Sequence, residues 1–170
     1  VNHLADQVEE YFGDGSRFNV SIEYLREPKP FGTVGPLSLL PNPPECSCLL
    51  INGDLVTKVN FDRVLDFHSD GGHDLTICVK EYPVHIPFGV VTTDGDRVLT
   101  FQEKPTEVRL INSGVYVLEP AVIKMVPKGY YDMNVLIESV IAQTEKKVGA
   151  FPIHEYWMDI GTSSDYRQAQ

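Results

Sequence analysis

The feature that most constrains this chain is the run Cys48-Leu49-Leu50-Ile51, which leads directly into Asn52-Gly53-Asp54. An unbroken apolar run of this length is typical of a strand buried on both faces of a sheet. Gly53 lets the backbone turn sharply, so we expect Asp54 at the carboxyl end of the strand. In open α/β sheets this edge binds ligands, and a carboxylate there suits a divalent cation that bridges to a phosphate. The alternative is a turn aspartate that caps the next helix.

Helical and strand patterns alternate on either side of this run. The expected elements are a helix capped by Asn2 and ended by Gly13, a strand over 20–24, a helix opened by Pro36, a helix after Asn60 and a strand over 75–80. Such alternation implies crossover connections and a parallel sheet, which predicts an α/β fold.

The pattern changes after residue 88. Two strand-like runs flank Asp94-Gly95, which predicts a hairpin. The run over 110–118 is a strand that contains Gly114, and a glycine there indicates a bulge or a close backbone approach. Further helices are expected over 120–125 and after Asp132, then a strand over 148–153, and last a helix after Thr162.

Composition excludes several classes of partner. A net charge of −10 argues against binding to nucleic acid or to an anionic membrane surface, and no apolar run approaches the roughly 20 residues of a membrane helix. Three cysteines in 170 residues suggest a reducing compartment, hence the cytoplasm. The length predicts one domain over 1–170, and both ends look cut, since Val1 leaves a strand and Gln170 falls in a helical pattern.

Three further stretches can carry chemistry. Gly32-Thr33-Val34-Gly35 lies between a strand and a helix and can hold a base edge or a phosphate, although an ordinary loop fits equally well. Glu103-Lys104 can bind sugar hydroxyls and a phosphate, although a solvated charge pair is the usual case. Asp159 follows Trp157-Met158 and can share a metal ion with Asp54, or it can cap the last helix.

Taken in order, six short motifs resemble one family. They are Gly32-Thr33-x-Gly35, Asn52-Gly53-Asp54, Phe88-Gly89-Val90, Glu103-Lys104-Pro105, Asn112-x-Gly114 and Trp157-x-Asp159-Ile160-Gly161. Together they look like the sugar-1-phosphate nucleotidyltransferases, and most like bacterial enzymes of the mannose-1-phosphate guanylyltransferase type, including forms that carry CBS domains in the same polypeptide.

The resemblance implies a Rossmann-like, mixed but mostly parallel sheet with helices on both faces and its first strand or strands missing. It implies transfer of a nucleotidyl group from a nucleoside triphosphate to a sugar 1-phosphate, with pyrophosphate as the second product. The roles it implies are nucleotide binding by Gly32, Thr33, Asn52 and Gly53, sugar binding by Gly89, Glu103 and Asn112, contact of Lys104 with the sugar phosphate, and a magnesium ion on Asp54 and Asp159. Asp54, Lys104 and Asp159 are the expected catalytic residues.

The chain also departs from the family pattern. Phe88 stands where tyrosine is common, and Pro36 where a small residue is usual. The family's glycine-rich loop, with its arginine and a downstream lysine, is not in this stretch, so we expect these 170 residues alone to be inactive.

Two other interpretations stay open. One is a non-catalytic module that senses sugar nucleotides or binds a partner, and the other, ranked low, is a dehydrogenase, whose dinucleotide fingerprint is not found here. The nucleotide base, the sugar, association with further copies of the chain, and CBS domains in the full-length polypeptide also stay open.

Overall fold

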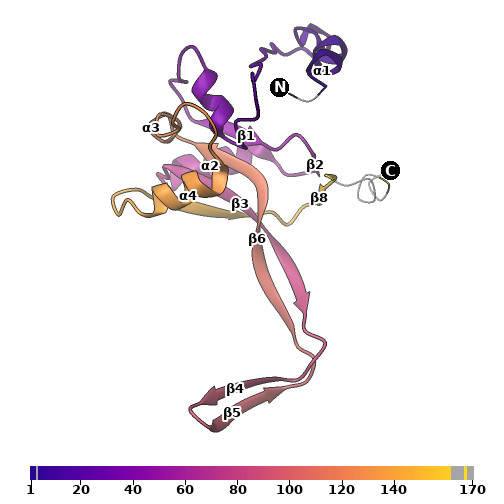
Figure 1. The fold of residues 1–170 in the computed structure, drawn as a ribbon, viewed down its shortest axis with the longest axis vertical. Coiled ribbons are helices and arrows are strands. Elements are labelled where there is room, and N and C mark those ends of the chain that lie inside the picture. The colour runs from indigo at the N-terminus through magenta and orange to yellow at the C-terminus, as the bar shows by residue number, and fades with distance from the viewer. Residues whose placement is uncertain (3, 162–166, 168–170) are drawn as a thin grey trace. The chain divides into compact units, whose positions relative to one another are not determined.

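The computed structural model describes residues 1–2, 4–161 and 167. The described elements are α1 (Ala5–Phe12), η1 (Ser16–Phe18), η2 (Gly35–Leu39), β1 (Cys48–Ile51), β2 (Leu55–Thr57), α2 (Phe61–Asp70), β3 (Leu75–His85), β4 (Val90–Asp94), β5 (Arg97–Gln102), β6 (Thr106–Leu118), α3 (Pro120–Ile123), α4 (Met133–Ile141), β7 (Val148–Pro152) and β8 (Trp157–Asp159), as Figure 1 shows. No helix in this described part is long and apolar enough to cross a membrane.

The chain divides into two compact units. The first comprises Val1–Cys48, Gly72–Leu75 and Leu118–Val148, and the second comprises Leu49–Gly71, Thr76–Val117 and Gly149–Gln170. The first unit contains α1, η1, η2, α3 and α4, and the second contains most of the sheet, α2 and the two smaller strand pairs.

The main sheet has four strands in the order β1-β6-β3-β7. The β3 and β7 strands run parallel, because the amide of Asp74 donates to Lys147 and the amide of Ile153 donates to Val79, in ascending order along both strands. The β6 and β3 strands run antiparallel, because Glu119 pairs with Asp74 at one end and Ile86 with Pro105 at the other. The sheet is therefore mixed and mostly antiparallel.

The predicted α/β class and mixed sheet are confirmed, but the prediction of a mostly parallel sheet is wrong. The antiparallel arrangement of β3 and β6 results from the hairpin between them. β3 continues past the expected end at Lys80, through Pro83 to His85, and the chain returns from the β4–β5 hairpin directly as β6 (Figure 1). Strands joined through a hairpin lie antiparallel, whereas parallel neighbours need a crossover.

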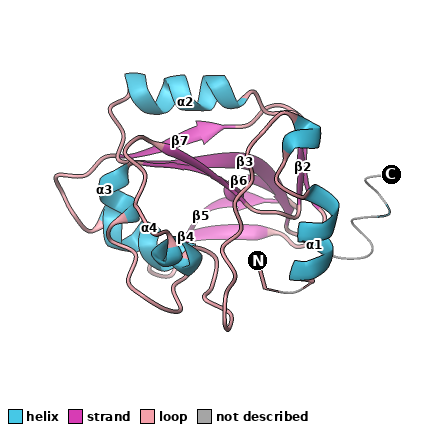
Figure 2. Cartoon of the chain, turned by 90° about the horizontal axis from the view of Figure 1, so that it is seen from above, coloured by secondary structure: helices cyan, strands magenta, loops and turns pink. Residues whose placement is uncertain are grey.

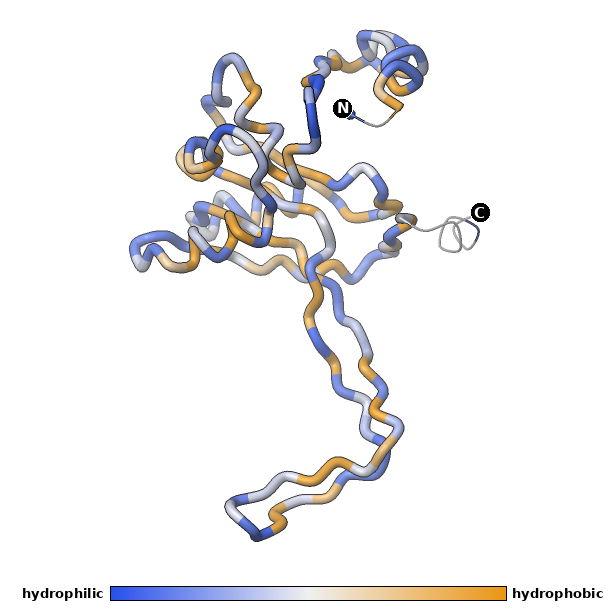
Figure 3. Tube along the Cα trace, in the orientation of Figure 1, coloured by the Kyte–Doolittle hydropathy of each residue, from blue (hydrophilic) through white to orange (hydrophobic). Residues whose placement is uncertain are grey.

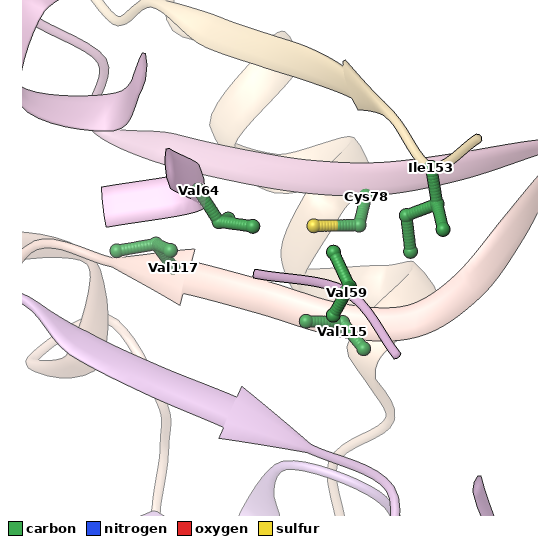
Figure 4. Close-up of a cluster of buried hydrophobic side chains, with 6 residues drawn as sticks. All are labelled: Val59, Val64, Cys78, Val115, Val117 and Ile153. Atoms are coloured by element: carbon green, nitrogen blue, oxygen red, sulfur yellow. The ribbon is translucent and has the colours of Figure 1, made fainter. Parts of the chain in front are cut away.

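The core of the second unit forms where α2 covers one face of the sheet (Figure 2). Its buried members are Val59, Val64, Cys78, Val115, Val117 and Ile153 (Figure 4). Asn60 caps α2 as predicted, since its Oδ1 accepts from the amide of Arg63 at 3.2 Å. Burial raises the pKa of the Cys78 thiol to about 12.

Several local predictions fail. No strand forms over 20–24, because the amides of Val20 and Ile22 donate back to the turn at Gly15 and Asp14 instead of to a neighbouring strand. β1 is only half-buried, with Ile51 39% exposed. The α1 helix ends at Gly13 as expected, but its N-cap residue is Leu4 and not Asn2.

Candidate active site

The two aspartates predicted to share a metal ion lie on neighbouring strands. β2 and β8 pair antiparallel with Leu55 opposite Asp159, and the amide of Ile160 donates to the carbonyl of Asp54 at 2.8 Å. A Cβ placed on Gly161 would lie 3.0 Å from Asp159 Oδ1 and 3.4 Å from Asp54 Oδ2. Both carboxylates therefore lie beside the same point. Carboxylates more than about 10 Å apart could not share an ion, and these two lie closer together than that.

The helix-cap alternative for Asp54 is wrong. The chain continues from Asp54 into β2, and Asn60 caps the next helix. Asp159 makes a local turn in which its Oδ1 accepts from the amide of Gly161 at 2.8 Å. The helix expected after Thr162 lies outside the described residues.

The donor set at this point fits magnesium. Two exposed carboxylates offer the hard oxygen ligands that Mg²⁺ takes, together with substrate phosphates and water. Among the described residues, no cluster of three or more His, Cys, Asp or Glu side chains is arranged to hold a metal ion. The magnesium ion on Asp54 and Asp159 stays a prediction.

The predicted residues Asn52 and Asn112 meet at Gly114. The amide of Asn52 donates to the Gly114 carbonyl at 2.9 Å, and Asn112 Oδ1 accepts from the Gly114 amide at 3.1 Å. Gly114 has φ +75°, and a Cβ on it would lie 2.8 Å from Asn52 Nδ2 and 3.1 Å from Leu55 Cδ1. The close approach expected at Gly114 is therefore made by the Asn52 side chain. Gly53, between Asn52 and Asp54, faces open space.

Two aromatic side chains hold this region together. Trp157 Nε1 donates to the carbonyl of Ser113 at 2.9 Å, which ties β8, and with it Asp159, to β6. The Asn112 amide donates to the hydroxyl of Tyr116 at 2.6 Å. Burial raises the pKa of Tyr116. A buried or half-buried indole normally finds an acceptor, and that signal could have indicated the role of Trp157 from the sequence.

A second group of predicted residues lies at the base of the β4–β5 hairpin. Val90 pairs with Gln102, which puts Gly89 and Glu103 side by side. A Cβ on Gly89 would lie 2.7 Å from Phe101 Cζ and 3.2 Å from Glu103 Oε2. Phe101, 64% exposed, was not singled out from the sequence. Lys104 follows with a left-handed backbone, φ 44°, and is exposed.

Gly32 and Thr33 lie in the first unit, next to the start of α4. The amide of Thr33 donates to Asp132 Oδ1 at 3.1 Å, and Thr33 Oγ1 accepts from the amide of Met133 at 2.7 Å. Asp132 occupies the N-cap position of α4 but its side chain makes no cap bond. The prediction that Asp132 caps the helix is therefore corrected: the hydroxyl of Thr33 takes that role from 100 residues away.

Sequence reasoning also missed a structural lysine. Lys80 Nζ donates to the carbonyls of Ile153 at 3.2 Å and Glu155 at 2.9 Å. These carbonyls belong to the turn that leads into β8. Lys80 thus holds the turn that precedes Trp157, and a lysine at the end of an apolar strand carries no sequence signal for such a role.

Similarity to known proteins extends over the whole chain. A family model described as Nucleotidyl transferase matches residues 1–170. The chain is 34% identical to a UTP–glucose-1-phosphate uridylyltransferase of Synechocystis, over 99% of this chain and 49% of the relative. It is 33% identical to a mannose-1-phosphate guanylyltransferase of Mycobacterium tuberculosis, over 91% of this chain and 45% of the relative. The chain spans about half the length of the curated relatives it matches.

Solved structures share the fold. HddC from Yersinia pseudotuberculosis, complexed with GMP-PN, aligns with a TM-score of 0.69 and 22% identity, over 99% of this chain and 74% of that one. A putative glucose-1-phosphate thymidylyltransferase from Bacillus anthracis, in complex with a sucrose, aligns with a TM-score of 0.72 and 18% identity, over 97% of this chain and 70% of that one. The family match, the curated relatives and the shared fold agree, and the chain belongs to the nucleotidyl transferase family, homologous to the sugar-1-phosphate nucleotidyltransferases.

Proposed function

We propose that the protein containing this chain transfers a nucleotidyl group from a nucleoside triphosphate to a sugar 1-phosphate, in the cytoplasm, with magnesium on Asp54 and Asp159. The observation that carries the proposal is the meeting of these two carboxylates beside Gly161, from strands more than a hundred residues apart in sequence. Two carboxylates that close repel one another. A divalent cation relieves that repulsion, which supports a metal site over two unrelated surface aspartates.

The reaction needs positioning and charge neutralisation more than acid–base chemistry. An oxygen of the sugar phosphate forms a bond to the α-phosphorus of the triphosphate, and the bond from that phosphorus to the bridging oxygen breaks, so that pyrophosphate leaves. When bound, magnesium would neutralise the phosphate oxygens between the two substrates. Lys104, at the base of the β4–β5 hairpin, would hold the sugar phosphate as a point charge.

The remaining predicted residues would bind the two substrates. Gly89, Glu103 and Asn112 would hold the sugar, since an exposed carboxylate and an amide suit sugar hydroxyls. Asn52 and Gly53 precede Asp54 and would contact the nucleotide close to the metal. Gly32 and Thr33 would bind the base. The proposal leaves the base and the sugar to experiment, since the relatives named above differ in both.

The test is pyrophosphate release by the full-length protein with magnesium. GTP, UTP, dTTP and ATP would each be paired with glucose 1-phosphate and mannose 1-phosphate. Asp54→Asn and Asp159→Asn should each lower turnover by roughly two orders of magnitude or more, as when other preorganised charge stabilisers are removed, without lowering the melting temperature. Asp66→Asn, an exposed aspartate of α2, is the matched control and should behave as wild type.

Two results would contradict the proposal. If Asp54→Asn and Asp159→Asn keep their turnover, the carboxylates do not hold the catalytic metal. If no substrate pair releases pyrophosphate, the alternative of a non-catalytic module gains support, and calorimetric titration with nucleotide sugars would then decide whether a sugar-nucleotide pocket exists.

A further inference from the structure

The loop over 31–35 is held by a small hydrogen-bonded clamp, formed within the first unit by this loop and the segment 130–133. Thr33 makes two hydrogen bonds to this segment: its amide donates to Asp132 Oδ1 at 3.1 Å, and its hydroxyl accepts from the amide of Met133 at 2.7 Å. Tyr130 donates its hydroxyl to Asp132 Oδ2 at 2.7 Å. Both oxygens of the Asp132 carboxylate are therefore engaged.

The backbone of Tyr131 completes the clamp. Its carbonyl accepts from the amides of Val34 at 3.2 Å and Gly35 at 3.0 Å, and its amide donates to the carbonyl of Phe31 at 2.8 Å. A Cβ on Gly35 would lie 2.4 Å from the carbonyl oxygen of Gly129. The two segments therefore touch so closely that a side chain at position 35 has no room.

Four of the five backbone amides in the loop over 31–35 have a hydrogen-bond acceptor. The amide of Phe31 donates to the Glu27 carboxylate at 2.9 Å, and the amides of Thr33, Val34 and Gly35 donate to the clamp. Within the part of the chain that the structure describes, the amide of Gly32 has no acceptor. Gly32 is also the one residue of this loop with a left-handed backbone, at φ +78°. An unpaired backbone donor next to four satisfied ones is suited to a ligand acceptor.

Asp132 is also one of two groups that restrict residue 32. A Cβ on Gly32 would lie 2.6 Å from Asp132 Oδ1 and 2.6 Å from the carbonyl oxygen of Tyr131. The carboxylate thus lies directly against the backbone of Gly32 while it holds the next amide along the chain. Its removal would take away one of the two groups that restrict the Gly32 peptide.

We propose that Asp132 is a positioning residue for the nucleotide: through Thr33 it fixes the orientation in which the Gly32 amide meets the base. This inference rests on the proposed function, in which Gly32 and Thr33 bind the base. Asp132 itself need not touch the substrate. The geometry predicts that its loss weakens binding of the triphosphate selectively and leaves the sugar phosphate unaffected, because Gly89, Glu103 and Asn112 lie in the second unit.

The experiment uses the full-length protein and the variants Asp132→Ala, Asp132→Asn and Glu138→Ala. Asparagine keeps an oxygen that can accept from Thr33, and Glu138 is an exposed carboxylate on the same helix, so it serves as the matched control. Asp132→Ala should raise the KM for GTP or UTP about tenfold, the loss expected from one charge-assisted hydrogen bond. The KM for sugar 1-phosphate should stay within about twofold of wild type, and Asp132→Asn should recover most of the loss.

Amide hydrogen exchange tests the clamp independently of activity. The amides of Thr33, Val34 and Gly35 should exchange faster in Asp132→Ala than in wild type, and at the wild-type rate in Glu138→Ala. Unchanged exchange of the Thr33 amide, which donates to Asp132 Oδ1, would show that the Asp132 carboxylate does not hold the loop. Equal changes in both KM values, or no change in either, would show a role unrelated to the nucleotide. If the wild-type protein binds none of GTP, UTP, dTTP and ATP in calorimetry, the proposed function fails, and the positioning role with it, while the exchange data still show whether the clamp exists.

Discussion

Gly114 offers a sharp test of the geometry around Asn52 and Leu55, on either side of Asp54. Replacing Gly114 with alanine imposes two separate costs. The backbone has φ +75°, and a residue with a Cβ in that region costs about 1–2 kcal/mol. The new Cβ would also lie 2.8 Å from Asn52 Nδ2 and 3.1 Å from Leu55 Cδ1, and overpacking of this kind costs roughly 1–3 kcal/mol more. We expect Gly114→Ala to lower the free energy of unfolding by roughly 2–5 kcal/mol.

Gly95→Ala is the matched control. Gly95 also has a positive φ, +60°, but a Cβ there would meet nothing within 4 Å. It should therefore show the backbone cost alone, and the difference between the two variants measures the close approach at Gly114. At about 2–4 °C per kcal/mol for a protein of this size, Gly114→Ala should melt roughly 4–20 °C below wild type.

Denaturant titration and thermal melting of the full-length protein measure both variants. Equal losses in Gly114→Ala and Gly95→Ala would refute the reasoning, because they would mean that Asn52 and Leu55 do not crowd Gly114. Turnover should fall in Gly114→Ala beyond what its stability explains, since the displaced Asn52 lies two residues before Asp54.

Two further predictions concern a charge and a thiol. In the full-length protein, Lys104→Ala should raise the KM for sugar 1-phosphate far more than the KM for the triphosphate. Lys128→Ala, which changes another exposed lysine, should alter neither KM. Equal effects of Lys104→Ala on both KM values would contradict the assignment of Lys104 to the sugar phosphate. Burial raises the pKa of Cys78 to about 12 from an ordinary value near 9, so its contribution to stability is complete below pH 9 and is lost as the pH rises toward 12. Unfolding measurements at pH 8 and pH 10 should therefore show a drop of about 1.4 kcal/mol in wild type that Cys78→Ala lacks, and an equal drop in both proteins would place its origin elsewhere.

The exposure of the apolar side chains on the β4–β5 hairpin could not be predicted from the sequence. Val91, Val98, Leu99 and Phe101 are each more than half exposed, and Figure 3 shows hydrophobic positions along this hairpin. Turn chemistry at Asp94-Gly95 and β-propensity act locally, and they predict the two strands correctly. These local signals say nothing about what lies on either side of those strands.

Local signals in the sequence determined the ends and types of several elements. Gly13 ends α1, Asn60 caps α2, and Asp94-Gly95 turns the hairpin, each through contacts within a few residues. The same signals were enough to pick out Asp54 and Asp159 as candidates, since Asp54 follows the apolar run of β1 and Asp159 ends β8. They could not show that the two meet, because pairing of β2 with β8 joins residues about a hundred positions apart.

Tertiary structure alone decided the direction of the strands and the contacts of Thr33 and Asp132. Whether β6 runs parallel or antiparallel to β3 depends on the hairpin that connects them, and both arrangements satisfy the same apolar pattern. Thr33 reads as a loop residue and Asp132 as a helix cap, and each assignment is locally reasonable. Only the fold brings them within hydrogen-bonding distance, where the Thr33 hydroxyl caps α4 and the Asp132 carboxylate accepts from the loop. A hydrogen bond depends on distance in space, and propensity and spacing along the chain carry no information about partners 100 residues away.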